Sequence, residues 1–384
     1  PLAMAHARAI SEPVYFLPPA TWFDPVNPEL EKAAREVIAQ CLVLQSVNEI
    51  TREAFSVGGE DLPEFLSDYL NGVFISYSTL VKCHLDHLLT NRADELPRRL
   101  WTGTGGALWN RILRHAVRRV EGFVTGHDHG PGTGYRAENN KPMLDYDACD
   151  RFVTYTVGQI DALRRNFREE LVLHEKLPEI TSYDRIIAQV GLPNRSNRSN
   201  GYHAAKKTGA LPPAKGKRHS VLYVASAMDG EFVRSYPALP DPVAIDWLAR
   251  LFSHLKTWGF EVFNKPHTKA GPSPEVLEDI LGVKSLHGNL EDIIHDYDIV
   301  IFDRPLSTCL YTTVASDRPL VFVDLEMVKW DQKAMALLRR RCAVVPASFD
   351  SSNRVQIDWN ELRGALDKAS NLMDRGFYET FLKF

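Results

Sequence analysis

The spacing of hydrophobic residues divides the chain at one polar stretch near its middle. Upstream, apolar residues recur at three- and four-residue steps over 61–89, which predicts a long helix. Downstream, short apolar runs alternate with amphipathic stretches. The dividing stretch, 193–217, is rich in Asn, Ser, Gly, Pro and Lys and has little to bury. We therefore expect two domains joined there by a flexible loop and linker.

The downstream half predicts strands and helices in regular alternation. The expected strands cover 219–225, 260–263, 298–302 and 319–324, and the expected helices cover 242–258, 274–281, 289–297 and 308–315. Such alternation is typical of a parallel sheet with helices on both faces. The predicted domain spans 218–358. Residues 359–384 follow it, with a helix at 359–373 that can cross back to the first domain.

The upstream half, 1–192, predicts a second α/β domain. Expected strands cover 14–17, 97–101, 122–125 and 150–156, and expected helices cover 28–44, 107–120 and 157–171. The predicted fold class is therefore α/β, with two Rossmann-like domains whose parallel sheets face a central cleft. The helix around 111–119 carries several Arg and His residues, which favours a solvated face, or contact with an anionic lipid or acceptor.

Composition narrows the classes of function. The chain has 384 residues and a net charge of -4, which provides no general attraction to nucleic acid. Its five cysteines are widely spaced without a CxxC pair, so neither a zinc site nor a disulfide framework is indicated, and a reducing cytoplasmic location is expected. No apolar run approaches the ~20 residues that cross a bilayer, so any membrane-bound partner would be met at the surface. Residues 1–3, before Met4, look like a remnant of cloning.

Candidate chemistry follows two predicted strands of the second domain. Ligands of open α/β sheets bind outside the carboxyl ends of the strands. Ser226 and Asp229 follow the strand at 219–225, where a carboxylate can point into a cleft or simply form a turn. Lys265 and His267 follow the strand at 260–263. A lysine with an imidazole suits phosphate better than an ordinary solvated turn.

Two further segments carry candidate residues. Ser307 and Thr308 open the helix after the strand at 298–302, where they can cap it or bind phosphate. The upstream strand at 122–125 runs into a glycine-rich loop, which is either an acceptor-binding wall with a general base or a plain surface turn. The candidates in this loop are His127, Asp128, His129, Gly130 and Gly132. No third ligand accompanies the two histidines nearby, so no metal is expected.

The downstream motifs resemble the donor-binding half of GT-B glycosyltransferases that build bacterial capsule, O-antigen and teichoic-acid polymers. The motifs are the turn at 265–267, the strand before Ser307-Thr308, and the segment 318–321. In this chain proline precedes His267, whereas the CMP-sugar sialyl- and Kdo-transferases have the order His-Pro. The resemblance implies a nucleotide-sugar site in the second domain, an acceptor site in the first, and no metal or other cofactor.

Two local resemblances bear on the donor. Residues 228–235 resemble the D-G-F-x-R-S loop of retaining β-Kdo transferases, with Glu231 as an extra residue. This resemblance implies CMP-Kdo as donor and Asp229 as a covalent nucleophile. His129-Gly130 resembles the His-Gly loop of CDP-glycerol glycerophosphotransferases. The alternatives are therefore a CDP-glycerol-type phosphotransferase, or an inverting CMP-sugar transferase with His129 or Asp128 as base.

The leading hypothesis is a glycosyltransferase that extends a bacterial surface glycan, the lipopolysaccharide O-antigen or capsule. Its partners would be a nucleotide-activated sugar and a lipid-linked or oligosaccharide acceptor, met at the cytoplasmic face of the inner membrane, and the chain can be one module of a larger polymerase. A nucleotide-sugar epimerase that uses Glu60-Asp61 is one alternative. A non-catalytic assembly module is another, because a fold does not fix a function.

Overall fold

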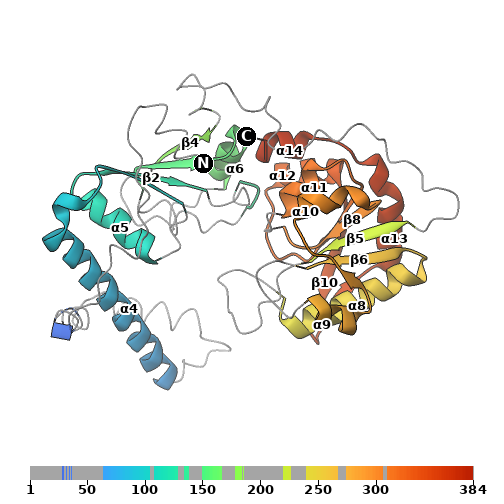
Figure 1. Cartoon of the computed structure of the whole chain (residues 1–384), viewed down its shortest axis with the longest axis horizontal. Coiled ribbons are helices and arrows are strands. Elements are labelled where there is room, and N and C mark those ends of the chain that lie inside the picture. Colours follow the sequence, from blue (N-terminus) through green and yellow to red (C-terminus); the bar gives the residue numbers. More distant parts are fainter. Residues whose placement is uncertain are drawn as a thin grey trace. The chain divides into compact units, whose positions relative to one another are not determined.

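The computed structural model describes most of the chain from residue 64 onward. The described residues are 28, 29, 32, 34, 36, 64–103, 108–128, 134–137, 149–166, 178–183, 185, 219–225, 239–266, 274–305 and 309–383. The chain forms two compact units (Figure 1). The first unit comprises Pro1–His129, Lys141–Val153 and Glu169–Ile180. The second unit comprises Gly130–Asn140, Thr154–Arg168 and Thr181–Phe384, so the units are interleaved in sequence.

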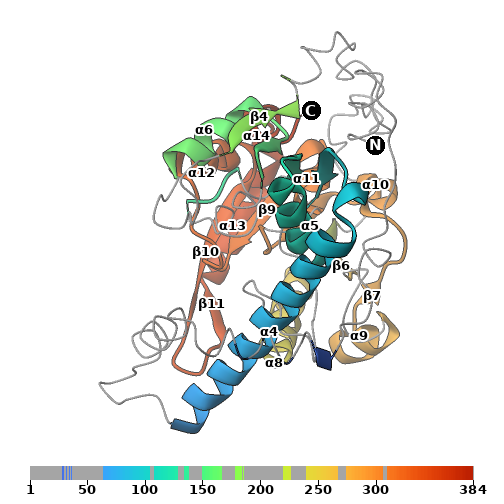
Figure 2. The ribbon, with the colours of Figure 1, turned by 90° about the vertical axis from the view of Figure 1, so that its left-hand side faces the viewer.

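The first unit is built on a small parallel sheet. Its elements in chain order are α4 (Glu64–Asn91), η2 (Ala93–Glu95), β1 (Arg99–Thr102), α5 (Leu108–Arg119), β2 (Phe123–His127) and β3 (Arg151–Thr154). β1, β2 and β3 pair in parallel, and β4 (Glu179–Ser182), which extends across the boundary into the second unit, is the fourth strand. α5 lies beside α4 (Figure 2), and their apolar faces form a core with β2 around Leu88, Ala116 and Val124.

One arginine of α5 is a core residue, which corrects the expectation of a solvated basic face. Arg114 is fully buried. Its Nε donates to Thr102 Oγ1 at 2.5 Å, and a terminal nitrogen donates to the carbonyl of Gly103. The side chain therefore fixes the backbone at the carboxyl end of β1. Arg118 lies farther out, 3.2 Å from Asp150.

The second unit is built on a seven-stranded sheet of the order β11-β10-β9-β8-β5-β6-β7 within the described residues. The strands are β5 (Ser220–Val224), β6 (Glu261–Lys265), β7 (Lys284–Ser285), β8 (Ile299–Phe302), β9 (Leu320–Asp324), β10 (Ala343–Phe349) and β11 (Val355–Ile357). Every neighbouring pair is parallel except β10 and β11, which are antiparallel. The six parallel strands, numbered along the chain, have the 3-2-1-4-5-6 order of the doubly wound Rossmann fold.

Alternate residues of the central strands face two separate cores, as expected for a sheet covered on both sides. Val221, Ile301 and Val323 face one core. That core includes residues of α8 (Asp241–Thr257), α9 (Pro274–Leu281) and α13 (Trp359–Lys368). Leu222 and Phe322 face the other. This second core includes residues of α6 (Val157–Arg165), α10 (Leu290–Ile293), η7 (Ile294–Asp296), α11 (Cys309–Ala315), α12 (Gln332–Arg341) and α14 (Gly376–Phe381). The short helix η8 (Ala369–Asn371) follows α13 and contributes Ala369 to the first core.

The structure confirms the predicted α/β class with parallel sheets, and the described strands and helices match the expected ones to within a few residues. β4, β7, β10, β11, α12 and α14 were not predicted. The expected strand at 14–17 lies outside the described residues, and the five described residues between 28 and 36 are helical. Among the described helices, none is long and apolar enough to span a bilayer.

Residues near the end of the chain hold α6 in the second unit. α13 packs on β9 and β10 of its own sheet, whereas α14 packs on α6 and α12 (Figure 2). Thr156 Oγ1 donates to the carbonyl of Thr380 at 2.7 Å, and Gln159 Nε2 donates to that of Phe381 at 2.9 Å. At the other end of α6, Arg165 pairs with Asp331 at 3.0 Å. The helix that follows β3 is thus built into the second unit.

Candidate functional site

Most of the residues selected from the sequence lie outside the described part of the chain. These are Ser226, Asp229, His267, Ser307 and Thr308 in the downstream half of the sequence, and His129, Gly130 and Gly132 in the glycine-rich segment. Their roles stay predictions. Lys265, His127 and Asp128 are described, and their surroundings show what the two sheet edges offer.

The carboxyl ends of β6, β5 and β8 lie next to one another in the second unit. Val224, the last residue of β5, pairs with Lys265 on one side and Phe302 on the other. The Ala225 amide donates to the Lys265 carbonyl at 3.0 Å, which extends the register by one residue. The strand order reverses between β5 and β8, and this switch point is where doubly wound sheets bind ligands. Lys265 and Asp303 are therefore positioned on either side of β5 at this edge.

Asp303, which was not selected from the sequence, organises the loop after β8. Its carboxylate is buried and accepts hydrogen bonds from the Tyr223 hydroxyl and, at 3.0 Å, from Trp247 Nε1. Burial and the nearby Asp303 charge raise the pKa of Tyr223 well above its ordinary value, so the phenol remains a donor. The bonds tie the loop to β5 and α8. A carboxylate directly after an apolar strand was the available signal.

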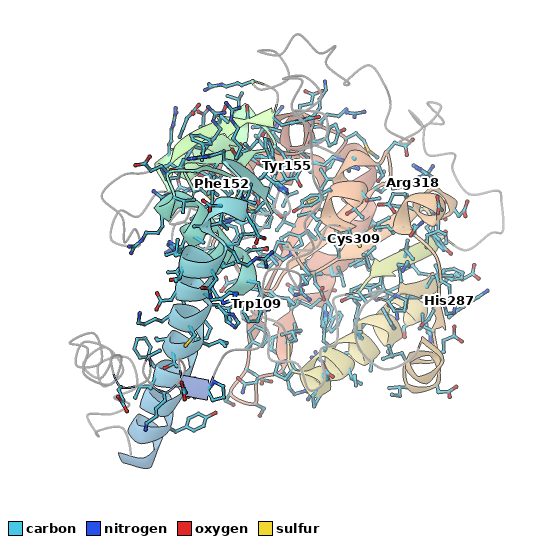
Figure 3. All side chains as sticks on the ribbon, turned by 60° about the vertical axis from the view of Figure 1, so that its left-hand side comes forward. Trp109, Phe152, Tyr155, His287, Cys309 and Arg318 are labelled. Atoms are coloured by element: carbon cyan, nitrogen blue, oxygen red, sulfur yellow. The ribbon has the colours of Figure 1, made fainter. Side chains whose placement is uncertain are left out.

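Lys265 is a largely buried cation at the same edge. Its Nζ donates to the Pro266 carbonyl at 3.0 Å. Burial lowers the pKa of Lys265, and electrostatic interactions with Cys309, at the start of α11 (Figure 3), and with Glu291 partly oppose this effect. Glu291 accepts a hydrogen bond from Thr312 Oγ1 at 2.8 Å, which orients the carboxylate. An ammonium with restricted access to water interacts more strongly with an anion than one on an open surface.

His127 and Asp128 occupy the corresponding edge of the first unit's sheet, at the end of β2. The Asp128 side chain is buried, and its amide donates to the Val153 carbonyl at 2.9 Å. His127 Nδ1 lies 3.0 Å from the Asp128 carbonyl, and its ring lies 6.2 Å from that of Trp101. Burial and these hydrogen bonds therefore restrict the positions of both His127 and Asp128, either of which can accept a proton. The use of either as a general base stays a prediction.

Groups of three or more metal-binding side chains were not found among the described residues. Among the described residues, two cations lie at or next to the ends of these strands: Lys265, and Arg304, which is buried directly after Asp303. These side chains can offset the charge of a phosphate group.

Neither a protein-family model nor a curated protein matches the chain. Solved structures similar to it include the Streptomyces sp. SF2575 glycosyltransferase SsfS6 complexed with thymidine diphosphate, at 14% identity and a TM-score of 0.33, covering 82% of this chain and 76% of that one. Sucrose-phosphate synthase from Thermosynechococcus elongatus gives 10% identity, a TM-score of 0.38, and coverage of 85% and 77%. The wall teichoic acid polymerase TagF gives 12% identity and a TM-score of 0.36, and the match covers 83% of this chain and 90% of that one. Similarities this low assign no function to the chain.

Proposed function

We propose that the chain is a GT-B glycosyltransferase that binds a nucleotide-activated donor in its second unit. The observation that carries the proposal is the Rossmann strand order with Lys265 and Asp303 on either side of β5 at the switch point. A nucleotide bound there would place its phosphate against the Lys265 ammonium. Two of the donor-half motifs, the turn at 265–267 and Ser307-Thr308, come in the sequence at the end of β6 and after β8, which supports the assignment.

The proposed roles follow from the chemistry of a nucleotide phosphate. Lys265 and His267 would hold the phosphate, joined by Ser226 and by Ser307 and Thr308 before α11. No metal is required in this arrangement, because the side-chain cations and hydrogen-bond donors offset the phosphate charge. The glycine-rich loop that follows β2 in the sequence would contact the acceptor.

The favoured donor is CMP-Kdo, on the evidence of the resemblance at 228–235. The Asp229 carboxylate would attack the anomeric carbon as the bond to the phosphate oxygen of CMP breaks. An acceptor hydroxyl of a bacterial surface glycan would then displace Asp229 and lose its proton to a base. If Asp229 does not form this adduct, His129 or Asp128 is the base of a single inverting displacement. The His129-Gly130 loop directly after β2 favours CDP-glycerol as the second candidate donor.

Nucleotide binding provides the first test. The protein is heated with CMP, CDP, UDP or GDP, and we expect the cytidine nucleotides to raise the melting temperature most. A ligand present at ~100 times its Kd stabilises the native state by about 2.7 kcal/mol. Lys265→Met should remove most of this shift. Lys284→Met is the matched control, because Lys284 is an exposed lysine on β7 of the same sheet.

The outcomes separate the parts of the proposal. Stabilisation by none of the four nucleotides would contradict a nucleotide-dependent glycosyltransferase. A preference for UDP or GDP would contradict both cytidine donors while leaving the enzyme class intact. For the mechanism, the protein is incubated with CMP-Kdo without acceptor and its intact mass is measured. An increase by one sugar residue that disappears in Asp229→Ala supports the retaining route, and an unchanged mass with full transferase activity contradicts it.

A further inference from the structure

Residues 134–137, here called the strap, belong to the second unit although the sequence on either side, up to His129 and from Lys141 to Val153, belongs to the first unit. The strap runs along residues 329–331. The Asp331 amide donates to the Tyr135 carbonyl at 2.9 Å, and the Ala137 amide donates to the Lys329 carbonyl at 2.7 Å. Arg136 and Trp330 form an antiparallel bridge between these bonds. Backbone pairing therefore fixes the strap's register.

Tyr135 is the strap's buried anchor. Its ring is fully buried and stacks on Trp330, with centroids 5.1 Å apart and planes at 21°, and lies 5.7 Å from the ring of Phe377. The packing leaves the hydroxyl one defined direction, and it donates to the carbonyl of Pro305. Pro305 is the second residue after Asp303 in the loop that follows β8. A residue 170 positions earlier in the sequence thus donates a hydrogen bond to the loop of the proposed donor site.

The strap has little freedom to shift along α6. A side chain at Gly134 would bring its Cβ within 2.2 Å of Gln159 Cγ and 2.9 Å of Gln159 Cα, so only glycine fits against this helix. Gln159 in turn donates to the Phe381 carbonyl at 2.9 Å. The Tyr135 hydroxyl is consequently held from the side of α6 as well as from the side of Trp330.

The loop after β8 is fixed at two points by groups on different elements. At Asp303 the carboxylate is held by Tyr223 of β5 and Trp247 of α8. At Pro305 the backbone carbonyl is held by Tyr135. Two anchors two residues apart restrict the rotation of the peptide groups between them. A binding loop that is ordered before the ligand arrives avoids the entropic cost of ordering on binding.

We infer that Tyr135 is a positioning residue for the donor-binding loop after β8. It would act through the Pro305 carbonyl and not by touching the donor. The inference rests on the proposed function in so far as that function places the donor at this loop. The strap, which the sequence places between two segments of the first unit, would then contribute to donor affinity through its tyrosine hydroxyl.

The test compares Tyr135→Phe with Thr156→Val in the full-length chain. Tyr135→Phe removes only the hydroxyl and keeps the stacked ring. Thr156→Val also removes a hydroxyl that donates to a backbone carbonyl of the second unit, but at Thr380. It removes in addition the cap of α6, where Thr156 Oγ1 accepts from the Gln159 amide, so it should destabilise the protein at least as much. Differences confined to Tyr135→Phe therefore report on the loop after β8 and not on general stability.

Hydrogen exchange without any ligand is measured first. We expect the amides of residues 302–304 to exchange faster in Tyr135→Phe and at the wild-type rate in Thr156→Val, because loss of a local bond opens a loop locally. CMP and CDP affinities are then measured by calorimetry. Loss of one hydrogen bond is worth about 1 kcal/mol, so the expected weakening is roughly 5-fold in Tyr135→Phe. Thr156→Val should bind as the wild type does.

The two measurements distinguish the inference from the proposed function. Unchanged exchange at 302–304 in Tyr135→Phe overturns the positioning role whether or not a nucleotide binds. Faster exchange with no nucleotide binding in the wild type supports the positioning of the loop and contradicts the proposed function. Faster exchange with equal nucleotide affinity in wild type and Tyr135→Phe overturns the link between the loop and the donor. Equal loss of nucleotide affinity in Tyr135→Phe and Thr156→Val also overturns this link, because the loss would then reflect lower stability of the protein.

Discussion

Replacement of Arg341 by methionine should destabilise the second unit severely. Arg341 is the last of three consecutive arginines at the end of α12, and its side chain is buried. Burial lowers the pKa of Arg341 to about 10, so the guanidinium is still charged at neutral pH. It donates to five backbone carbonyls, those of Thr313, Val314, Ser316, Arg318 and Leu372. These carbonyls include two in the last turn of α11 and two in the turn that leads into β9.

The magnitude follows from the bonds that would be lost. Three of them, to Val314, Ser316 and Arg318, are 3.1 Å or shorter. A buried acceptor left without a donor costs about 1–3 kcal/mol. Methionine fills a similar volume and removes the cost of burying a charge, which offsets part of this loss. The expected net loss is therefore about 3 kcal/mol, against the ~5–15 kcal/mol that typically separates folded from unfolded domains.

Urea unfolding followed by total tryptophan fluorescence provides the assay, since four of the seven tryptophans, Trp247, Trp258, Trp330 and Trp359, belong to the second unit. Arg339→Met is the matched control, since Arg339 is an exposed arginine on the same helix. Its free energy of unfolding should change by less than about 0.5 kcal/mol. Arg341→Lys should be intermediate, because an ammonium has three donors where the guanidinium has five. A loss below about 1 kcal/mol in Arg341→Met would refute the reasoning, since it would mean that the carbonyls find other partners.

Two further predictions concern binding and packing. Nucleotide affinity should fall as pH rises through the lowered pKa of Lys265, in a window below the ordinary lysine value of 10.5, because only the protonated amine attracts phosphate. Calorimetry over this range should show the fall in wild type and not in Lys265→Arg; a parallel fall in both would assign the titration to another group. Gly158→Ala should destabilise the protein by about 1–3 kcal/mol, since the new Cβ would lie 2.3 Å from the Thr380 carbonyl. In urea unfolding, the control Gly364→Ala, where a Cβ meets nothing within 4 Å, should cost nothing, and equal effects would contradict the predicted clash.

The regular elements of the second unit were predictable because burial imposes a simple pattern on them. β8 is apolar at every position, as a strand covered on both faces requires, and α8 places its buried residues on one helical face. β10 was missed because Pro346 interrupts its sequence. α12 was missed because its five apolar residues form one continuous run, 334–338, without helical spacing, and nothing in the run 339–341 shows which of the three arginines is buried.

The candidate site was predictable only where a residue's role depends on its own strand. Lys265 is the last residue of β6, so the position of β6 in the sheet is enough to place it at the edge. The role of Asp303 depends instead on Tyr223 and Trp247, which lie 80 and 56 residues away along the chain. The role of Tyr135 depends on Pro305, which is 170 residues away. Partnerships of this kind arise from tertiary packing, which local periodicity does not encode.

The bonds that hold α6 have a consequence for synthesis on the ribosome. Thr156 and Gln159 bond to Thr380 and Phe381, over sequence separations of 224 and 222 residues. Every segment of the first unit is translated before residue 181. The helix α6 lies between these segments in the sequence, but its bonding partners are translated more than two hundred residues after it. Contacts at such separation form slowly, and apolar surface left uncovered in the meantime favours aggregation. The nascent chain should therefore depend on chaperones until residue 381 has left the exit tunnel.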